Sequence, residues 1–267
     1  MGYSHISAYD HILGVDPNQT GQQVILDPIT EPSSDPFILF SYMASVTERV
    51  SFVTRILVLP QRQTALVAKQ AATLDVLCNG RLRLGVGLGW NDLEFTARNE
   101  AFYNRSRRIE EQVSVLRQLW GQFFVNFSGN WHHIHNVGIN PHPIQQLIQI
   151  WFGGHKEATL PRAAKLGDGW MPNDLTIDET RPLIRSLKQY LTEQNRDPTK
   201  FGIDPRVVYD SNIDRMVDLI REWASLGATH VSIDTMGLGF SKPEMHLKAL
   251  RSVADIIIPI FQSPESF

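Results

Sequence analysis

The chain has 267 residues, of which 42% are hydrophobic, and its formal net charge at pH 7 is −3. The length suits one α/β barrel domain over residues 1–267, and the lack of a basic excess argues against a nucleic-acid partner. No apolar run is long enough for a membrane helix and the first residues lack a signal-peptide pattern, so a cytoplasmic protein with no membrane partner is expected.

Short apolar runs alternate with segments of helical period, which is the pattern of parallel strands joined by crossover helices. The predicted strands are 5–9, 50–59, 82–88, 148–152, 169–171, 202–208 and 229–234. Apolar stripes predict helices around 67–78, 109–120, 183–191, 217–224 and 247–254. The first of these helices is expected to end at Asn79-Gly80 and to bury Cys78, the single cysteine, as a packing residue.

Two segments interrupt this alternation. Residues 123–135 read as two strands about a Ser-Gly-Asn turn, which predicts an antiparallel hairpin inserted between barrel units. Residues 20–35 contain two prolines and many polar side chains, and they are expected to form a long loop near the barrel mouth that helps to shape the substrate site. Neither segment indicates a domain boundary.

Asp10-His11 directly follows a predicted strand, and ligands collect at the carboxyl ends of strands in parallel α/β proteins. An imidazole can titrate or donate a hydrogen bond near neutral pH, and the neighbouring carboxylate can orient the loop or fix a tautomer. An equally good interpretation is that these two loop residues only cap a turn.

Two glycine-rich segments end predicted strands. The alternating glycines of 85–89 would let a flat ring lie against the backbone, although they could equally serve tight packing. Trp90 stands where a dinucleotide-binding fingerprint needs its last glycine, so a Rossmann domain is disfavoured. Gly153-Gly154-His155 leads into a predicted helix, where backbone N–H groups could bind a phosphate or where the glycines could serve the turn alone.

The sequence lacks the residue patterns that metal sites, several hydrolases and several kinases require. His132, His133 and His135 lie on the predicted hairpin and alternate between its faces, and no cysteine or carboxylate cluster completes a ligand set, so no metal site is predicted. The sequence also has no Gly-x-Ser-x-Gly nucleophile elbow and no Walker phosphate loop, which argues against hydrolases and kinases of those classes.

Taken together, these segments resemble the luciferase-like monooxygenase family, particularly its branch that uses the deazaflavin coenzyme F-420. The resemblance runs in order through nearly the whole chain, in Asp10-His11, 57–60 with 68–75, 79–90 with Glu94-Phe95, 150–154, 167–170 and 227–237. The block 79–90 is the most specific of these matches. No motif is decisive alone, but six in register are hard to obtain by chance.

The resemblance implies a TIM-type (β/α) barrel that holds a flavin-like ring at the carboxyl end of its strands. His11 would lie near the ring as proton donor or orienting group, with Asp10 beside it, and Trp90 would wall the ring or the substrate. The end of the strand at Thr54, Arg55 and Ile56, together with Gly89, would contact the cofactor, and a bulge with a non-proline cis peptide would fall near Arg55-Ile56. The cofactor phosphate would bind the N–H groups of Gly153, Gly154 and His155.

Three features depart from the family pattern. The barrel apparently lacks its first strand and helix, which leaves about seven strands where eight are needed, so an upstream start or an open barrel is expected. Arg55 stands where a small residue is usual, and its guanidinium could pair with a phosphate or a substrate carboxylate, or could crowd the ring. Trp90 replaces the acid of the sugar-phosphate dehydrogenases, so that substrate is not carried over.

The sequence therefore predicts an oxidoreductase that transfers a hydride between coenzyme F-420 and a small organic substrate. An FMN-dependent monooxygenase that activates oxygen is the alternative within the enzymes. A non-catalytic flavin-binding or degenerate barrel is the alternative from another class. The resemblance also implies a homodimer.

Overall fold

The computed structural model describes residues 1–14 and 32–262, which pack as two compact units. The N-terminal unit is Ser7–Phe152, and the C-terminal unit combines Met1–Ile6 with Gly153–Phe267. The prediction of one domain over the whole chain stays a prediction. Of the predicted loop 20–35, residues 20–31 lie outside the described residues.

Strand β4 (Leu82–Gly87) is the centre of the N-terminal unit, and all six of its residues are buried. It pairs in parallel with β2 (Ser51–Thr54), β3 (Leu57–Val58) and β7 (Gln149–Gly153). A strand buried on both faces needs mostly apolar or small residues, and the one charged residue of β4, Arg83, lies over the Trp151 ring at 4.3 Å. The predicted parallel arrangement is confirmed for these strands.

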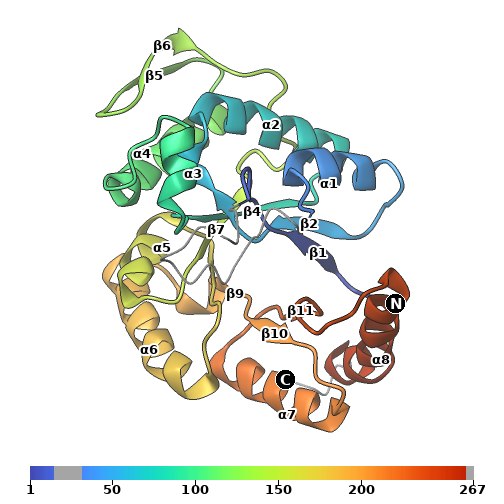
Figure 1. Ribbon diagram of the computed structural model, residues 1–267. Helices are drawn as coiled ribbons and strands as arrows, with labels where there is room; N and C mark the ends of the chain where they lie inside the picture. The colour runs from blue at the N-terminus through green and yellow to red at the C-terminus, as the bar shows by residue number, and fades with distance from the viewer. Residues whose placement is uncertain (15–31, 263–267) are drawn as a thin grey trace. The chain divides into compact units, whose positions relative to one another are not determined.

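Helices follow these strands along the chain (Figure 1). They are α1 (Pro36–Ala44), the 3-10 helix η1 (Leu59–Gln61), α2 (Thr64–Leu77), α3 (Asp92–Ala97) and α4 (Arg105–Gly121). Helices α2 and α4 confirm the predictions, Cys78 is fully buried, and Asn79 and Gly80 both have positive φ, as the predicted left-handed cap requires. Helices α1 and α3 were not predicted, because they are short and, in α1, apolar on several sides.

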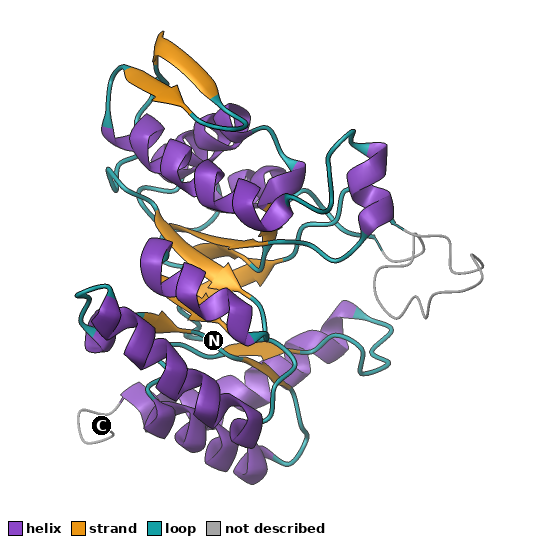
Figure 2. Cartoon of the chain, turned by 90° about the vertical axis from the view of Figure 1, so that its left-hand side faces the viewer, coloured by secondary structure: helices purple, strands orange, loops and turns teal. Residues whose placement is uncertain are grey.

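The predicted hairpin insertion is confirmed. Strands β5 (Val125–Ser128) and β6 (His133–Val137) pair in antiparallel fashion outside the helices of the N-terminal unit (Figure 2). His132, at the turn, lies 2.8 Å from Oε1 of Glu111 through Nδ1 and 2.6 Å from Oγ1 of Thr64 through Nε2. These two contacts fasten the hairpin to α4 and to the start of α2.

The C-terminal unit continues the alternation of strands and helices. Its elements are η2 (Glu157–Thr159), α5 (Leu160–Leu166), β8 (Gly169–Met171), α6 (Ile177–Glu193), η3 (Pro198–Lys200), β9 (Gly202–Ile203), β10 (Arg206–Val208), α7 (Ile213–Leu226), β11 (Ser232–Asp234) and α8 (Pro243–Gln262). Strand β8 pairs in parallel with β9, and β10 pairs in parallel with β11. Consecutive helices from α5 to α8 pack against one another, and the core between α7, α8 and β10 is built on Trp223, Val207 and Val253.

Three predicted strands have different bounds in the structure. The predicted strand 50–59 is two strands, because Phe52 pairs with Leu82 whereas Leu57 pairs with Val86, which leaves one extra residue between them as a bulge. The predicted strand 202–208 is interrupted at 204–205, where proline cannot donate a ladder hydrogen bond. The predicted strand 229–234 is shortened to β11.

The strand β1 (His5–Ala8) confirms the prediction for 5–9 to within one residue and leads directly to Asp10 and His11. Its last carbonyl, on Ala8, accepts the N–H of Arg55 at 2.7 Å. The end of β1 therefore lies beside the bulge after β2, within the N-terminal unit. Across residues 1–14 and 32–262, no helix is both long and apolar enough to cross a bilayer.

Candidate active site

The carboxyl ends of β1 and β4 bring two of the predicted site residues together in the N-terminal unit. The ring centroids of His11 and Trp90 are 6.3 Å apart, with 55° between the ring planes. The His11 side chain is 16% exposed and Trp90 is 47% exposed. An imidazole and a flat indole thus lie next to each other at a surface that a ligand can reach.

Asp10 is held by a buried arginine that sequence reasoning did not single out. The Arg62 guanidinium donates to both carboxylate oxygens of Asp10, at 3.0 Å through Nε and 2.6 Å through Nη2. The N–H of Val58 also donates to Asp10, and Nη2 of Arg62 reaches Asp35 at 2.9 Å. Because protein donors already take both oxygens of the 2% exposed Asp10, this residue orients the loop that carries His11.

Glu94 forms a second buried support on the other side of His11. Its Oε1 accepts the N–H groups of Ile12 at 2.7 Å and Leu13 at 3.2 Å, and its Oε2 accepts Nε2 of Gln61 at 3.1 Å. Oε2 also lies 3.7 Å from Nδ1 of His11. Burial alone would raise the pKa of Glu94, but the nearby His11 imidazole and hydrogen bonds from Gln61 and the two backbone groups lower this pKa to about 2. Glu94 is therefore ionised at neutral pH.

The predicted residues Thr54, Arg55 and Ile56 lie in the same unit, at the end of β2. The peptide bond between Arg55 and Ile56 is cis, which confirms the position that the resemblance implied. The buried Thr54 hydroxyl donates to the carbonyl of Gly85 at 2.7 Å, so it is engaged by the protein. The Ile56 side chain packs over Gly87, where an added Cβ would lie 2.6 Å from Cδ1 of Ile56.

Gly89 is required by its protein neighbours as well as by its backbone conformation. Its φ is +72°, and an added Cβ would lie 2.5 Å from Cγ1 of Val58 and 3.2 Å from Cε2 of Phe95. The packing reading of the 85–89 glycines is therefore correct for Gly87 and Gly89. A contact between Gly89 and a cofactor stays a prediction.

Replacing Gly89 with alanine is expected to lower the free energy of unfolding by about 2–4 kcal/mol, from left-handed strain plus overpacking. Urea unfolding followed by tryptophan fluorescence measures this loss. Gly237→Ala is the matched control, because Gly237 has φ +71° but an added Cβ meets no atom within 4 Å. An equal loss in both variants would show that the contacts with Val58 and Phe95 carry no energy.

The predicted phosphate-binding segment lies in the C-terminal unit, at the end of β7. Gly154 has φ +142°, and its N–H donates to the carbonyl of Met171 at 3.3 Å while its own carbonyl accepts the indole N–H of Trp170 at 2.8 Å. The Gly154 backbone is thus engaged within the protein. Gly153 and His155 stay predicted phosphate donors, with His155 two residues before η2.

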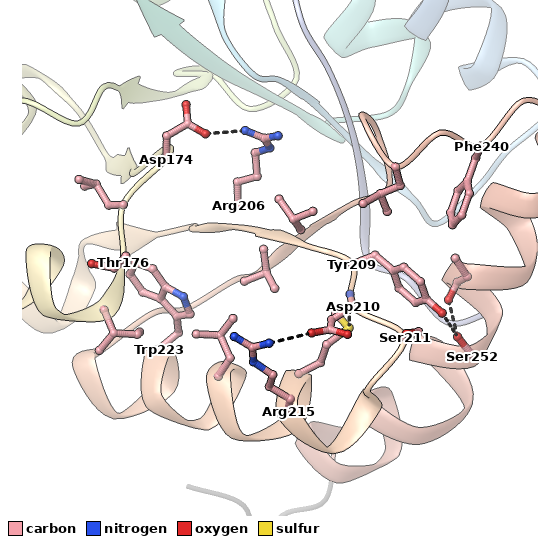
Figure 3. A pocket seen from close by; sticks show the side chains of 18 of the residues that line it. Asp174, Thr176, Arg206, Tyr209, Asp210, Ser211, Arg215, Trp223, Phe240 and Ser252 are labelled. Carbon is pink, nitrogen blue, oxygen red and sulfur yellow. Dashed lines mark hydrogen bonds and ion pairs between the residues drawn. The ribbon is translucent and has the colours of Figure 1, made fainter.

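A cavity of about 1160 Å³ lies in the C-terminal unit between β10, α7 and α8 (Figure 3). Its two guanidinium groups already carry carboxylate partners, since Arg206 contacts Asp234 at 2.6 Å and Asp174 at 2.7 Å, and Arg215 contacts Asp210 at 3.4 Å. Much of the remaining wall is the apolar surface of the core. Among the described residues that line this cavity, none is a predicted site residue.

Sequence reasoning missed Arg62, Gln61 and the role of Glu94. Their partners are distant in the chain, and a charged residue that will be buried looks the same in a sequence as one on the surface. Glu94 was visible only as part of the resemblance, four residues after Trp90. In the part of the chain that the structure describes, no group of three histidine, cysteine or acidic side chains is placed to hold a metal ion.

The fold and the site define an α/β protein of the TIM-barrel type with a histidine at the carboxyl end of an early strand. The sequence profile described as luciferase-like monooxygenase matches residues 4–253. The chain therefore belongs to the luciferase-like monooxygenase family, and the predicted family and fold class are confirmed.

Curated relatives differ in the cofactor that their names print. An uncharacterized protein of Mycobacterium tuberculosis is 30% identical over 234 residues, which are 85% of this chain and 78% of that protein. The F420-dependent glucose-6-phosphate dehydrogenase of Amycolatopsis mediterranei is 26% identical over 69% of this chain and 57% of its own length. The FMNH(2)-dependent dimethylsulfone monooxygenase of Pseudomonas fluorescens is 29% identical over 64% of this chain and 47% of its own length.

Solved structures agree on the fold. The monooxygenase RslO1 from Streptomyces bottropensis has a TM-score of 0.79 at 18% identity and covers 97% of this chain and 89% of its own. The coenzyme F420-dependent tetrahydromethanopterin reductase from Methanopyrus kandleri has a TM-score of 0.75 at 16% identity, and the match covers 86% of this chain and 88% of the reductase chain. At these identities the likeness concerns the fold alone.

Proposed function

We propose that the protein is an oxidoreductase that transfers a hydride between coenzyme F-420 and a small organic substrate. The observation that carries the proposal is the accessible His11–Trp90 pair, which stands between two buried supports, Arg62 with Asp10 and Glu94 with Gln61. Such preorganisation costs stability unless each buried charge is paired or hydrogen-bonded, and here Asp10 is paired with Arg62 while Glu94 accepts hydrogen bonds on both oxygens. The F420-dependent relative supports the choice of coenzyme.

The side chains present fit a planar redox coenzyme. Trp90 offers a half-exposed flat face beside the His11 imidazole. When bound, the coenzyme supplies the ring that takes up or releases the hydride. His11 would hold or release a proton near that ring, Trp90 would exclude water from one side, and Asp10 would keep the His11 loop in place.

An FMN-dependent monooxygenase is the second candidate, favoured by the FMNH(2)-dependent relative. The same residues suit it, because a flavin ring has the same flat shape as a deazaflavin. A non-catalytic flavin-binding barrel is the third candidate. The predicted phosphate contact of Gly153 and His155 belongs to all three, and a comparison of FMN with riboflavin, which lacks the phosphate, tests it.

Titration of the whole chain with F-420 and with FMN, followed by cofactor fluorescence, decides among these candidates. The proposal expects F-420 to bind well below 1 mM and turnover with a small organic substrate, screened first among alcohols, to bleach F-420 without consuming oxygen. Binding of FMN with oxygen-consuming turnover would favour the monooxygenase. If neither cofactor binds below about 1 mM, which corresponds to only about 4 kcal/mol, the enzyme proposal is wrong.

The proposal includes three further expectations. The substrate is a small molecule, the protein acts in the cytoplasm, and it forms a homodimer as the resemblance implies. Light scattering of the purified protein measures the last of these directly.

A further inference from the structure

Glu94 and Trp90 belong to one short segment that leads into and forms α3. Asn91 caps this helix by accepting the N–H of Leu93 at 3.1 Å, and Glu94 lies in its first turn. The Glu94 carboxylate then binds the backbone just after His11. The loop of His11 is thus tied to the same helix that starts after Trp90, which explains why the two rings lie 6.3 Å apart.

We infer that Glu94 is the positioning residue of the site, holding the His11 loop through Oε1 and keeping the imidazole proton on Nδ1 through Oε2. His11 then has Nε2 as the nitrogen that can accept a proton or a hydrogen bond in its neutral form. This inference rests on the proposed function, because it concerns the residue to which that function assigns the proton.

The donors around Glu94 require a carboxylate at this position. Four groups face its two oxygens: the N–H groups of Ile12 and Leu13, Nε2 of Gln61 and Nδ1 of His11. The two backbone N–H groups can only donate to Oε1, and the Gln61 amide donates to Oε2 in the orientation present, so both carboxylate oxygens act as acceptors. At 3.7 Å the His11 contact is longer than an ordinary hydrogen bond, and such contacts commonly tighten when a ligand binds.

A carboxylate that accepts from Nδ1 stabilises the tautomer that carries the proton there. Other charged groups in the same network are already satisfied, since Arg62 is bound to Asp10 and Asp35. A glutamine at position 94 would keep one oxygen for the backbone N–H groups of Ile12 and Leu13. It would turn an NH2 group toward Gln61 and His11, and a donor facing Nδ1 favours the opposite tautomer.

The test is the tautomer of His11 in the protein without cofactor, read from the 15N shifts and couplings of its ring at about pH 8.5, where an ordinary imidazole is neutral. The His11→Ala spectrum assigns the signals. We expect the proton on Nδ1 in the wild-type protein and on Nε2 in Glu94→Gln. The exposed Glu48 supplies the control, and Glu48→Gln should leave both ring signals unchanged.

If the wild-type protein carries the His11 proton on Nε2, the inference is wrong. This measurement needs no variant, so it can be made even if Glu94→Gln does not fold. A folded Glu94→Gln protein whose His11 tautomer is unchanged would overturn it equally. In turnover with F-420, Glu94→Gln should lower kcat about 10- to 100-fold with little change in KM, and Glu94→Asp should recover part of the loss. Because the tautomer is measured without cofactor, a failure of the inference about Glu94 can be distinguished from a failure of F-420 to bind.

Discussion

Replacing Arg62 with methionine is expected to lower the free energy of unfolding by about 3–5 kcal/mol, the range for removing one partner of a buried ion pair. The Arg62 side chain is 9% exposed and contacts both Asp10 and Asp35. Without it, the buried Asp10 carboxylate loses both hydrogen bonds from the guanidinium and keeps the one from the N–H of Val58. Methionine retains much of the volume of the arginine stem, so the loss reports the charge rather than a cavity.

Urea unfolding of the whole chain measures this effect, with Arg49→Met as the control because Arg49 is exposed. Arg62→Lys keeps the charge but loses the forked geometry. Its free energy of unfolding should therefore lie between those of Arg49→Met and Arg62→Met. In the double variant Arg62→Met with Asp10→Asn, part of the loss should return, since no unpaired charge remains buried. If Arg62→Met costs less than 1 kcal/mol, the Asp10 network does not hold the His11 loop.

The strands could be predicted where burial leaves a continuous trace in the sequence. Strand β4 is buried at every position, and its apolar and glycine residues predicted a strand despite Arg83, while the alternation with helices indicated the α/β class. The interruption of the segment 50–59 followed from the resemblance and not from the pattern, because Arg55 and Ile56 look like ordinary strand residues. The break at 204–205 coincides with Pro205, yet apolar residues before and after it made the segment look like one strand.

The site could be predicted only in part. Asp10, His11 and Trp90 follow strands directly, and local position is visible in a sequence. The residues that hold them are paired over long separations: Arg62 lies 52 residues from Asp10, and Glu94 lies 82 residues from Ile12. Such pairs depend on how strands are ordered in space, which periodicity does not contain.

The His11→Ala variant is expected to lower kcat about 10²- to 10⁴-fold, the usual contribution of a positioned general acid or base. The measurement is the rate of F-420 bleaching with the small organic substrate that the wild-type protein turns over fastest. An imidazole titrates near neutral pH, so the limb that His11 contributes to the pH profile of kcat/KM should also disappear. His133→Ala is the control, because His133 is an exposed residue of the hairpin strand β6.

The two roles proposed for His11 give different kinetics. If His11 transfers the proton, kcat falls while the dissociation constant of F-420 changes little, since the Trp90 face and the backbone contacts remain. If His11 only orients the ring, the dissociation constant rises and the rate at saturating F-420 recovers. An unchanged kcat with unchanged F-420 binding would remove His11 from the mechanism, and the two buried supports around its loop would then serve stability alone.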